Sequence, residues 1–157
     1  MSQDRWIRYA GTTYRLRPDE RALDALLRGG APVNFSCRKG TCRSCMLQVT
    51  SGTVGENAVK TLPQDMREAG FFLPCCADDI HRVEATAPDL SLCAVTAMVV
   101  EKQWLAPDIL RVKFEPERVV DWFVGQTITL SKPNGESRPY SIVSLPEDYY
   151  LTVDMRI

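Results

Sequence analysis

The stretch SCRKGTCRSC, residues 36–45, decides how this chain is interpreted. It places three cysteines close together, and a fourth follows in FLPCCA, so that the full spacing is Cys37-x4-Cys42-x2-Cys45-x29-Cys75. Cysteine thiolates bind iron–sulfur clusters or zinc, or carry out thiol chemistry themselves. The residues between the cysteines help to distinguish these uses.

The cysteine-rich loop has the composition that a cluster of two irons and two sulfides needs. Four thiolates can bind such a cluster, two on each iron, if the loop backbone curls around it. Gly40 permits backbone conformations that are closed to other residues. Backbone N–H groups can approach the sulfurs beside the small residues Ser36, Thr41 and Ser44. Positive charges that would offset the negative charge of the cluster are carried by Arg38, Lys39 and Arg43.

The spacing C-x4-C-x2-C…C is the plant-type [2Fe–2S] pattern. On these motifs, residues 1–87 resemble a plant-type ferredoxin domain, with CRKGTCRSC as the cluster loop. The resemblance implies a β-grasp fold and a [2Fe–2S] cluster. The implied metal ligands are Cys37, Cys42, Cys45 and Cys75.

The segments around the loop predict an α+β fold. RWIRYAGTTYRLRP alternates polar and apolar residues, which predicts a β-hairpin over about residues 5–17. DERALDALLRGG predicts a short helix that Asp19 caps and Gly29-Gly30 ends. MLQVTSGTV and HRVEATA predict strands, and LPQDMREAG predicts a second short helix.

Three other uses of the cysteines and the histidine fit the sequence less well. Zinc sites usually pair cysteines in two separate knuckles, whereas here three lie in one loop and the fourth stands alone. A thioredoxin-like use of Cys42-Arg-Ser-Cys45 would need a helix after the motif, but the sequence predicts a strand. A Rieske-type centre needs two histidines, and His81 is the only one.

The adjacent cysteines Cys75 and Cys76 raise the question of which one is the ligand. If both lie on a strand, their side chains point to opposite faces, so only one can face the cluster. The spacing favours Cys75. Cys76 and Cys93 are then predicted to be small buried apolar residues.

The character of the chain changes after a linker predicted at residues 88–93. Residues 94–157 predict five strands without a long helix: VTAMVVEKQWL, ILRVKFEP, GQTITLSK, RPYSIVS and YYLTVDMRI. Their turns and lengths favour a partial antiparallel β-barrel. Trp104 and Trp122 could lie in its core or face a further domain, and the core is favoured.

The segment RPYSIVS carries the second functional pattern. Along a strand, Arg138 and Tyr140 share one face and Ser141 lies on the other side or at a bend. Arginine binds phosphate, tyrosine stacks on a flat ring, and serine can hydrogen-bond a ring nitrogen. Residues 94–157 resemble the start of the FAD-binding barrel of the ferredoxin–NADP reductase family. That resemblance implies FAD, bound by Arg138, Tyr140 and Ser141.

A ferredoxin domain followed by such a barrel resembles the reductase components of bacterial multicomponent oxygenases, of the aromatic-ring or methane/phenol type. The resemblance implies an oxidoreductase that passes electrons from NAD(P)H through FAD and the [2Fe–2S] cluster to an oxygenase. The cluster and flavin relay electrons, so no catalytic side chain is predicted. The alternative is a stand-alone ferredoxin-like carrier whose C-terminal part docks a partner without flavin.

The resemblance also predicts that this chain is the N-terminal fragment of a longer reductase. That barrel has six strands and five are predicted here, and no G-x-G-x-x-G segment for a nicotinamide domain is present. The 157 residues alone are therefore not expected to have NAD(P)H-dependent activity.

Composition excludes several other classes of protein. The 19 Lys and Arg against 20 Asp and Glu leave a net charge of −1, without the excess of a nucleic-acid binder. No apolar run is long enough to cross a membrane, and the charged N-terminus predicts a cytoplasmic protein. Six cysteines in that compartment favour metal or redox use over a disulfide framework.

Overall fold

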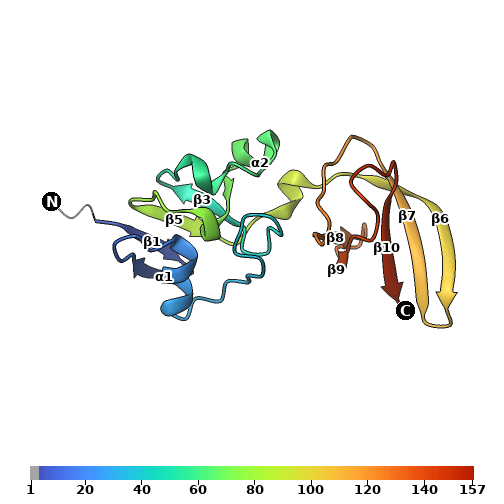
Figure 1. The fold of residues 1–157 in the computed structure, drawn as a ribbon, viewed down its shortest axis with the longest axis horizontal. Helices are drawn as coiled ribbons and strands as arrows, with labels where there is room; N and C mark the ends of the chain where they lie inside the picture. The colour runs from blue at the N-terminus through green and yellow to red at the C-terminus, as the bar shows by residue number, and fades with distance from the viewer. Residues whose placement is uncertain (1–3) are drawn as a thin grey trace. The chain divides into compact units, whose positions relative to one another are not determined.

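The computed structural model describes residues 4–157. The chain divides into two compact units, the first ending at Ala94 and the second spanning Val95–Ile157. In Figure 1 the first unit runs from blue to green and the second from yellow to red. No helix within the described residues is long and apolar enough to span a bilayer.

The first unit is built on a five-stranded mixed sheet with the order β2-β1-β5-β3-β4. Its strands are β1 (Trp6–Tyr9), β2 (Thr12–Arg15), β3 (Leu47–Ser51), β4 (Phe71–Phe72) and β5 (Val83–Thr86). The strands β1 and β2 form the predicted antiparallel hairpin, and β1 pairs with β5 in parallel. The strand β3 runs antiparallel to both β5 and β4, and the fold is α+β as predicted.

Two short helices and three 3₁₀ turns complete this unit. They are α1 (Ala22–Arg28), α2 (Gln64–Glu68), η1 (Glu56–Ala58), η2 (Pro74–Cys76) and η3 (Leu90–Cys93). The apolar stripe of α1 is buried as the sequence predicts, but the expected cap by Asp19 is wrong. The helix begins later, at N-cap Arg21, and no side chain caps it.

The core of the first unit lies between the sheet, α1 and the segment around η2. Its largest fully buried side chains are Ile7, Leu23, Leu26, Phe71, Phe72, Leu73, Ile80, Val83 and Pro74. Cys45 and Cys75 belong to the same buried cluster. The two cysteines are therefore positioned by the core of the domain.

The carboxylate of Glu20 connects the start of α1 with its end. It accepts hydrogen bonds from Arg28 Nε and Nη2, each at 2.9 Å, and from the Arg17 backbone N–H at 2.8 Å. The Arg28 hydrogen bond lowers the pKa of Glu20 to about 2, against an opposing effect of burial. Because the folded-state pKa is depressed, the carboxylate stabilises the fold above about pH 4.5, and this stability is lost as the pH falls toward 2.

We expect Glu20→Gln to lower the free energy of unfolding at pH 7 by about 1 kcal/mol. The difference from the unaltered protein should shrink as the pH falls toward 3, where Glu20 is already largely protonated in the unfolded chain but still largely ionised in the folded one. Urea unfolding followed by circular dichroism at both pH values measures it. Asp4→Asn is the control, because Asp4 pairs with Arg15 at the surface. An equal loss of unfolding free energy in both variants would refute a specific role for Glu20.

The second unit contains the five predicted strands. They are β6 (Ala97–Ala106), β7 (Ile109–Pro116), β8 (Thr127–Ser131), β9 (Ser137–Ser141) and β10 (Leu151–Arg156). Their pairings are antiparallel, in one sheet of order β10-β7-β6 and another formed by β8 and β9. An isolated bridge between Ile142 and Val153 links the segment after β9 to β10. The described strands therefore form an open, partial barrel with β6 and β8 at its edges.

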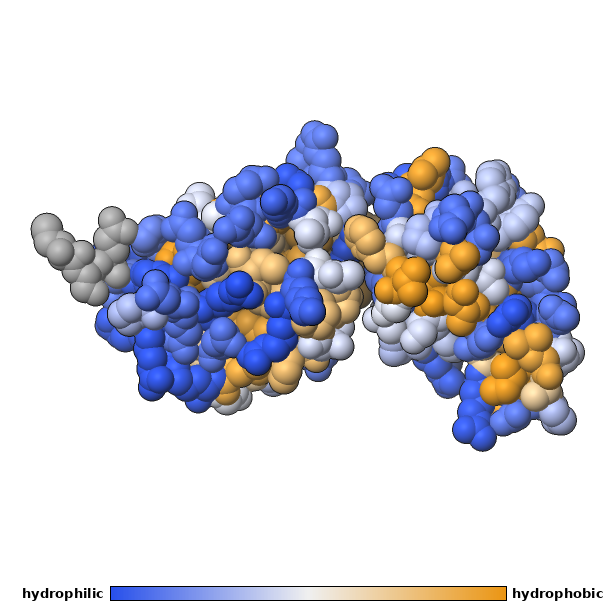
Figure 2. Space-filling view, viewed as in Figure 1, coloured by the Kyte–Doolittle hydropathy of each residue, from blue (hydrophilic) through white to orange (hydrophobic). Residues whose placement is uncertain are grey.

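The core of this unit is small. Trp122, Ile142, Leu151 and Val153 are buried in it, so the prediction for Trp122 is confirmed. The prediction for Trp104 is wrong, since its side chain is 60% exposed on the edge strand β6. Figure 2 shows apolar side chains gathered on the surface of the second unit.

Candidate functional site

The cysteine loop curls around the sulfur of Cys37. Three backbone N–H groups donate to this sulfur, those of Lys39 and Thr41 at 3.4 Å and that of Cys42 at 3.3 Å. In return, the Cys37 N–H donates to the sulfur of Cys42 at 3.4 Å. The loop therefore places the donors that a thiolate ligand needs, and among the small residues of the prediction Thr41 supplies one of them.

Left-handed backbone conformations produce this curl. Gly40 has φ +78°, and the non-glycine residues Arg38 and Arg43 have φ of 55° and 61°. Residues in this region turn successive N–H groups toward one concave side, where they form a nest for negative charge. The carbonyl of Gly40 accepts a hydrogen bond from the Thr61 hydroxyl at 2.7 Å, which connects the loop to the segment after η1.

Cys45 and Cys75 form a second pair of sulfurs in the buried core. Their side chains are hydrogen-bonded to each other, and the Gly40 backbone also hydrogen-bonds Cys75. The turn η2 that carries Cys75 is attached to α1, because Arg21 Nη1 donates to the Cys75 carbonyl at 3.1 Å. The structure thus brings all four predicted ligands to one loop region.

Hydrogen bonds and burial shift the pKa values of Cys37, Cys45 and Cys75. Burial raises the pKa of Cys37, but the N–H groups of Cys42, Lys39 and Thr41 outweigh it and lower the pKa to about 6. The hydrogen bond with Cys75 lowers the pKa of Cys45, and that same bond, with burial, raises the pKa of Cys75. One sulfur in each pair is therefore predisposed to be a thiolate.

The donor set fits a two-iron cluster better than one zinc ion. The sulfurs form two pairs, Cys37 with Cys42 and Cys45 with Cys75. Two thiolates per iron is the arrangement that a [2Fe–2S] cluster needs.

The positive side chains of the loop have partners of their own. The guanidinium of Arg38 pairs with the Asp24 carboxylate and lies 5.4 Å from the centre of the Phe35 ring. Arg43 Nη1 approaches the sulfur of Met66 at 3.9 Å. Part of the charge predicted to offset the cluster is therefore already balanced by Asp24.

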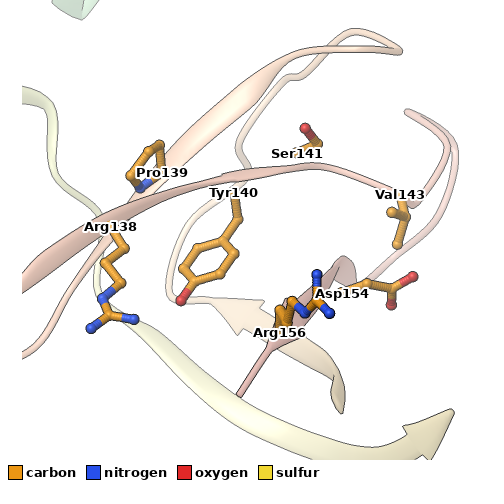
Figure 3. Close-up of a pocket in the computed structure, with 7 residues that line it drawn as sticks. All are labelled: Arg138, Pro139, Tyr140, Ser141, Val143, Asp154 and Arg156. Carbon is orange, nitrogen blue, oxygen red and sulfur yellow. The ribbon is translucent and has the colours of Figure 1, made fainter. Parts of the chain in front are cut away.

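A pocket of about 510 Å³ lies in the second unit beside β9 and β10. Its lining consists of Arg138, Pro139, Tyr140, Ser141, Val143, Asp154 and Arg156. Figure 3 shows the side chains of Arg138 and Tyr140 on the same side of β9, with Ser141 pointing the other way. This is the arrangement that a strand predicts for these three residues.

Two charged residues of β10 complete the pocket, and the sequence analysis missed them. The Asp154 carboxylate is held by Arg111 through two hydrogen bonds of 2.7 and 2.8 Å, which lower the pKa of Asp154. Arg156 Nε donates to Asp108 at 3.0 Å. Their spacing of two residues indicates a shared face, but only the bridge between Ile142 and Val153 brings β10 to this pocket.

Comparison with known families identifies the first unit. Residues 7–78 match the family described as the 2Fe-2S iron-sulfur cluster binding domain. Residues 7–78 are therefore similar to a 2Fe-2S domain. This segment contains the whole cysteine loop, both sulfur pairs and the turn η2.

The chain as a whole is similar to reductase components of oxygenase systems. It is 33% identical to the phenol hydroxylase P5 protein of Acinetobacter pittii (strain PHEA-2), over 94% of this chain and 45% of that protein. It is 32% identical to the aromatic O-demethylase reductase subunit of Amycolatopsis sp. (strain ATCC 39116 / 75iv2), over 96% and 48%. The chain therefore spans about half the length of these relatives.

Solved structures also match the chain. The crystal structure of Amycolatopsis cytochrome P450 reductase GcoB aligns at 30% identity with a TM-score of 0.48, over 97% of this chain and 49% of that one.

The fifth cysteine of the 2Fe-2S domain departs from the sequence prediction. Cys75 and Cys76 lie on the 3₁₀ turn η2 and not on a strand, so they do not point to opposite faces. Their sulfurs are 3.7 Å apart. Cys76 is half-buried, and burial, followed by the effect of Cys75, raises its pKa to about 11. Cys93 is also half-buried, and its thiol donates to the Leu90 carbonyl at 3.4 Å.

Proposed function

We propose that this chain is the electron-transfer part of an oxygenase reductase. The observation that carries the proposal is the pairing of four sulfurs within the 2Fe-2S domain. The ligands are Cys37, Cys42, Cys45 and Cys75. A bound [2Fe–2S] cluster supplies one-electron transfer.

The protein contributes position and electrostatics to this transfer. The N–H groups of Lys39, Thr41 and Cys42 stabilise negative charge on the sulfur of Cys37. Burial of Cys45 and Cys75 excludes water from one side of the site. The loop remains at the surface, which leaves a short path for an electron to a partner.

The second unit is proposed to bind FAD through Arg138, Tyr140 and Ser141. The pocket beside β9, where Arg138 and Tyr140 lie on the same side of the strand, supports this assignment. NAD(P)H would transfer a hydride to FAD in the whole protein. The two electrons would then leave singly through the 2Fe-2S domain to an oxygenase, and the proton would pass to water.

The domain limits belong to the same proposal. We assign residues 1–87 to the ferredoxin domain, 88–93 to a linker and 94–157 to part of the flavin-binding barrel. A cytoplasmic location is included, because reduced thiols persist in that compartment.

A second candidate function is a stand-alone carrier whose C-terminal unit docks a partner without flavin. The exposed apolar residues of β6, which include Met98, Trp104 and Leu105, favour it. An edge strand with unpaired backbone groups can also pair with another chain. Flavin content after anaerobic purification separates the two functions, because only the reductase part is expected to bind FAD.

The electron-transfer function can be tested on the chain itself. Anaerobic reduction with dithionite should produce the low-temperature EPR signal of a reduced [2Fe–2S] cluster. Oxidised cytochrome c, added next, should remove about one electron per cluster and abolish the signal. A dithionite-treated protein without this signal would contradict the function.

Tyr140→Ala is expected to weaken flavin binding about tenfold or more, because the face that stacks on the flat ring is lost. Equilibrium titration of the protein with FAD, followed by flavin fluorescence, measures the dissociation constant. Tyr149→Ala serves as the control, since Tyr149 is an exposed tyrosine of the same unit that does not line the pocket. Equal affinities for Tyr140→Ala and the control would exclude Tyr140 from the flavin site.

A further inference from the structure

The sulfur of Cys76 lies inside the candidate cluster site, although the spacing assigns it no ligand role. It is 3.7 Å from the sulfur of Cys75, within the distance of a hydrogen bond between sulfurs. The 3₁₀ turn explains this proximity, because neighbours on such a turn are separated by about a third of a turn and not by half. The smaller angle allows the two sulfurs to lie beside each other, as their separation of 3.7 Å shows.

Cys76 also contacts the cysteine loop at its glycine. A Cβ atom added to Gly40 would lie 2.8 Å from the Cys76 sulfur, so the glycine backbone packs directly on this thiol. Gly40 is the residue whose backbone hydrogen-bonds Cys75. Cys76 thus touches the fourth predicted ligand and the residue that donates to that ligand.

A protonated thiol next to a ligand sulfur affects how readily the cluster is reduced. An S–H group is a weak hydrogen-bond donor, and an ordinary cysteine keeps its proton at neutral pH. Hydrogen bonds to cluster sulfurs stabilise negative charge, which increases when the cluster accepts an electron. A donor at this position therefore makes reduction more favourable.

We propose that Cys76 is a positioning residue of the cluster site whose thiol donates to the sulfur of Cys75 and raises the reduction potential of the cluster. The inference rests on the proposed function, because it takes Cys75 as a cluster ligand. It adds a role for a residue that lies outside the four-cysteine pattern.

Three variants separate hydrogen bonding from packing. Cys76→Val fills the space beside Gly40 without a hydrogen-bond donor. Cys76→Ser keeps a donor in a smaller side chain. Cys76→Ala removes both the donor and most of the side-chain volume. The readout is the midpoint potential of the cluster, from an EPR-monitored redox titration. A structural role alone would not make the valine and serine variants differ in a consistent direction.

The valine and alanine variants are expected to have lower midpoint potentials than the unaltered protein. At a fixed applied potential, the ratio of reduced to oxidised cluster should fall about threefold or more, which corresponds to about 30 mV for one electron. The serine variant should have a potential equal to or above that of the unaltered protein. If valine leaves the potential unchanged, or if serine lowers it as much as valine does, the inference is overturned.

Iron and sulfide content distinguish this inference from the function on which it rests. If the unaltered protein contains no cluster, the proposed function fails. If the unaltered protein contains the cluster and all Cys76 variants keep both it and its potential, only the inference fails. If Cys76→Val loses iron while Cys75→Ala keeps it, Cys76 is the ligand and the inference is overturned.

Discussion

Protein with Cys45→Ala is expected to be purified with about tenfold less iron and sulfide than the unaltered chain, or with none. Cys45 is only 4% exposed and its sulfur pairs with that of Cys75 in the core. Alanine removes one of two thiolates on an iron, and water cannot easily take its place in a buried position. Iron, acid-labile sulfide and the visible absorption spectrum measure the loss.

Cys93→Ala is the matched control for this variant. Cys93 is a half-buried cysteine of the same unit, and its thiol hydrogen-bonds the Leu90 carbonyl in η3. Its removal should leave the iron and sulfide content unchanged. Full iron and sulfide in the Cys45→Ala protein would show that Cys45 is not a ligand.

Gly40→Ala is expected to destabilise the cysteine loop by about 1–3 kcal/mol and to lower the cluster content. The backbone φ of +78° is unfavourable for alanine, and the new Cβ would lie 2.8 Å from the Cys76 sulfur. The loop would have to move away from η2, and this movement weakens the Gly40 hydrogen bond to Cys75. Chemical unfolding and iron content together measure the effect.

Gly11→Ala is the control that separates the effect of backbone strain from the effect of the contact with Cys76. Gly11 lies in the same unit with the same φ of +78°, but a Cβ there would have nothing within 4 Å. The control should therefore show only the backbone strain and should keep its cluster. If both variants lose the same stability and both keep the cluster, the packing of Gly40 on Cys76 has no role in the site.

The cysteine loop could be predicted from sequence because its geometry is local. Gly40 and the small residues around it are within a few positions of the sulfurs, so residue type and spacing determine which N–H groups reach them. The strands of both units, apart from the two-residue β4, were predictable for a similar reason, since alternation is a local pattern.

Other features of the structure depend on contacts between segments, and the spacing of residues in the sequence does not predict these contacts. The orientation of Cys76 follows from the 3₁₀ turn after β4, which the sequence analysis did not predict. Asp154 reaches the pocket only through the pairing that brings β10 beside the segment after β9. The exposure of Trp104 follows from the position of β6 at the edge of its sheet, while Trp122 is buried.

The most direct test of the account is the content of iron, acid-labile sulfide and zinc in protein purified without oxygen. We predict about two irons and two sulfides per chain and no stoichiometric zinc, because the sulfurs form two pairs in a 2Fe-2S domain. One zinc per chain without sulfide would contradict the cluster assignment and, with it, the proposal that this protein transfers electrons.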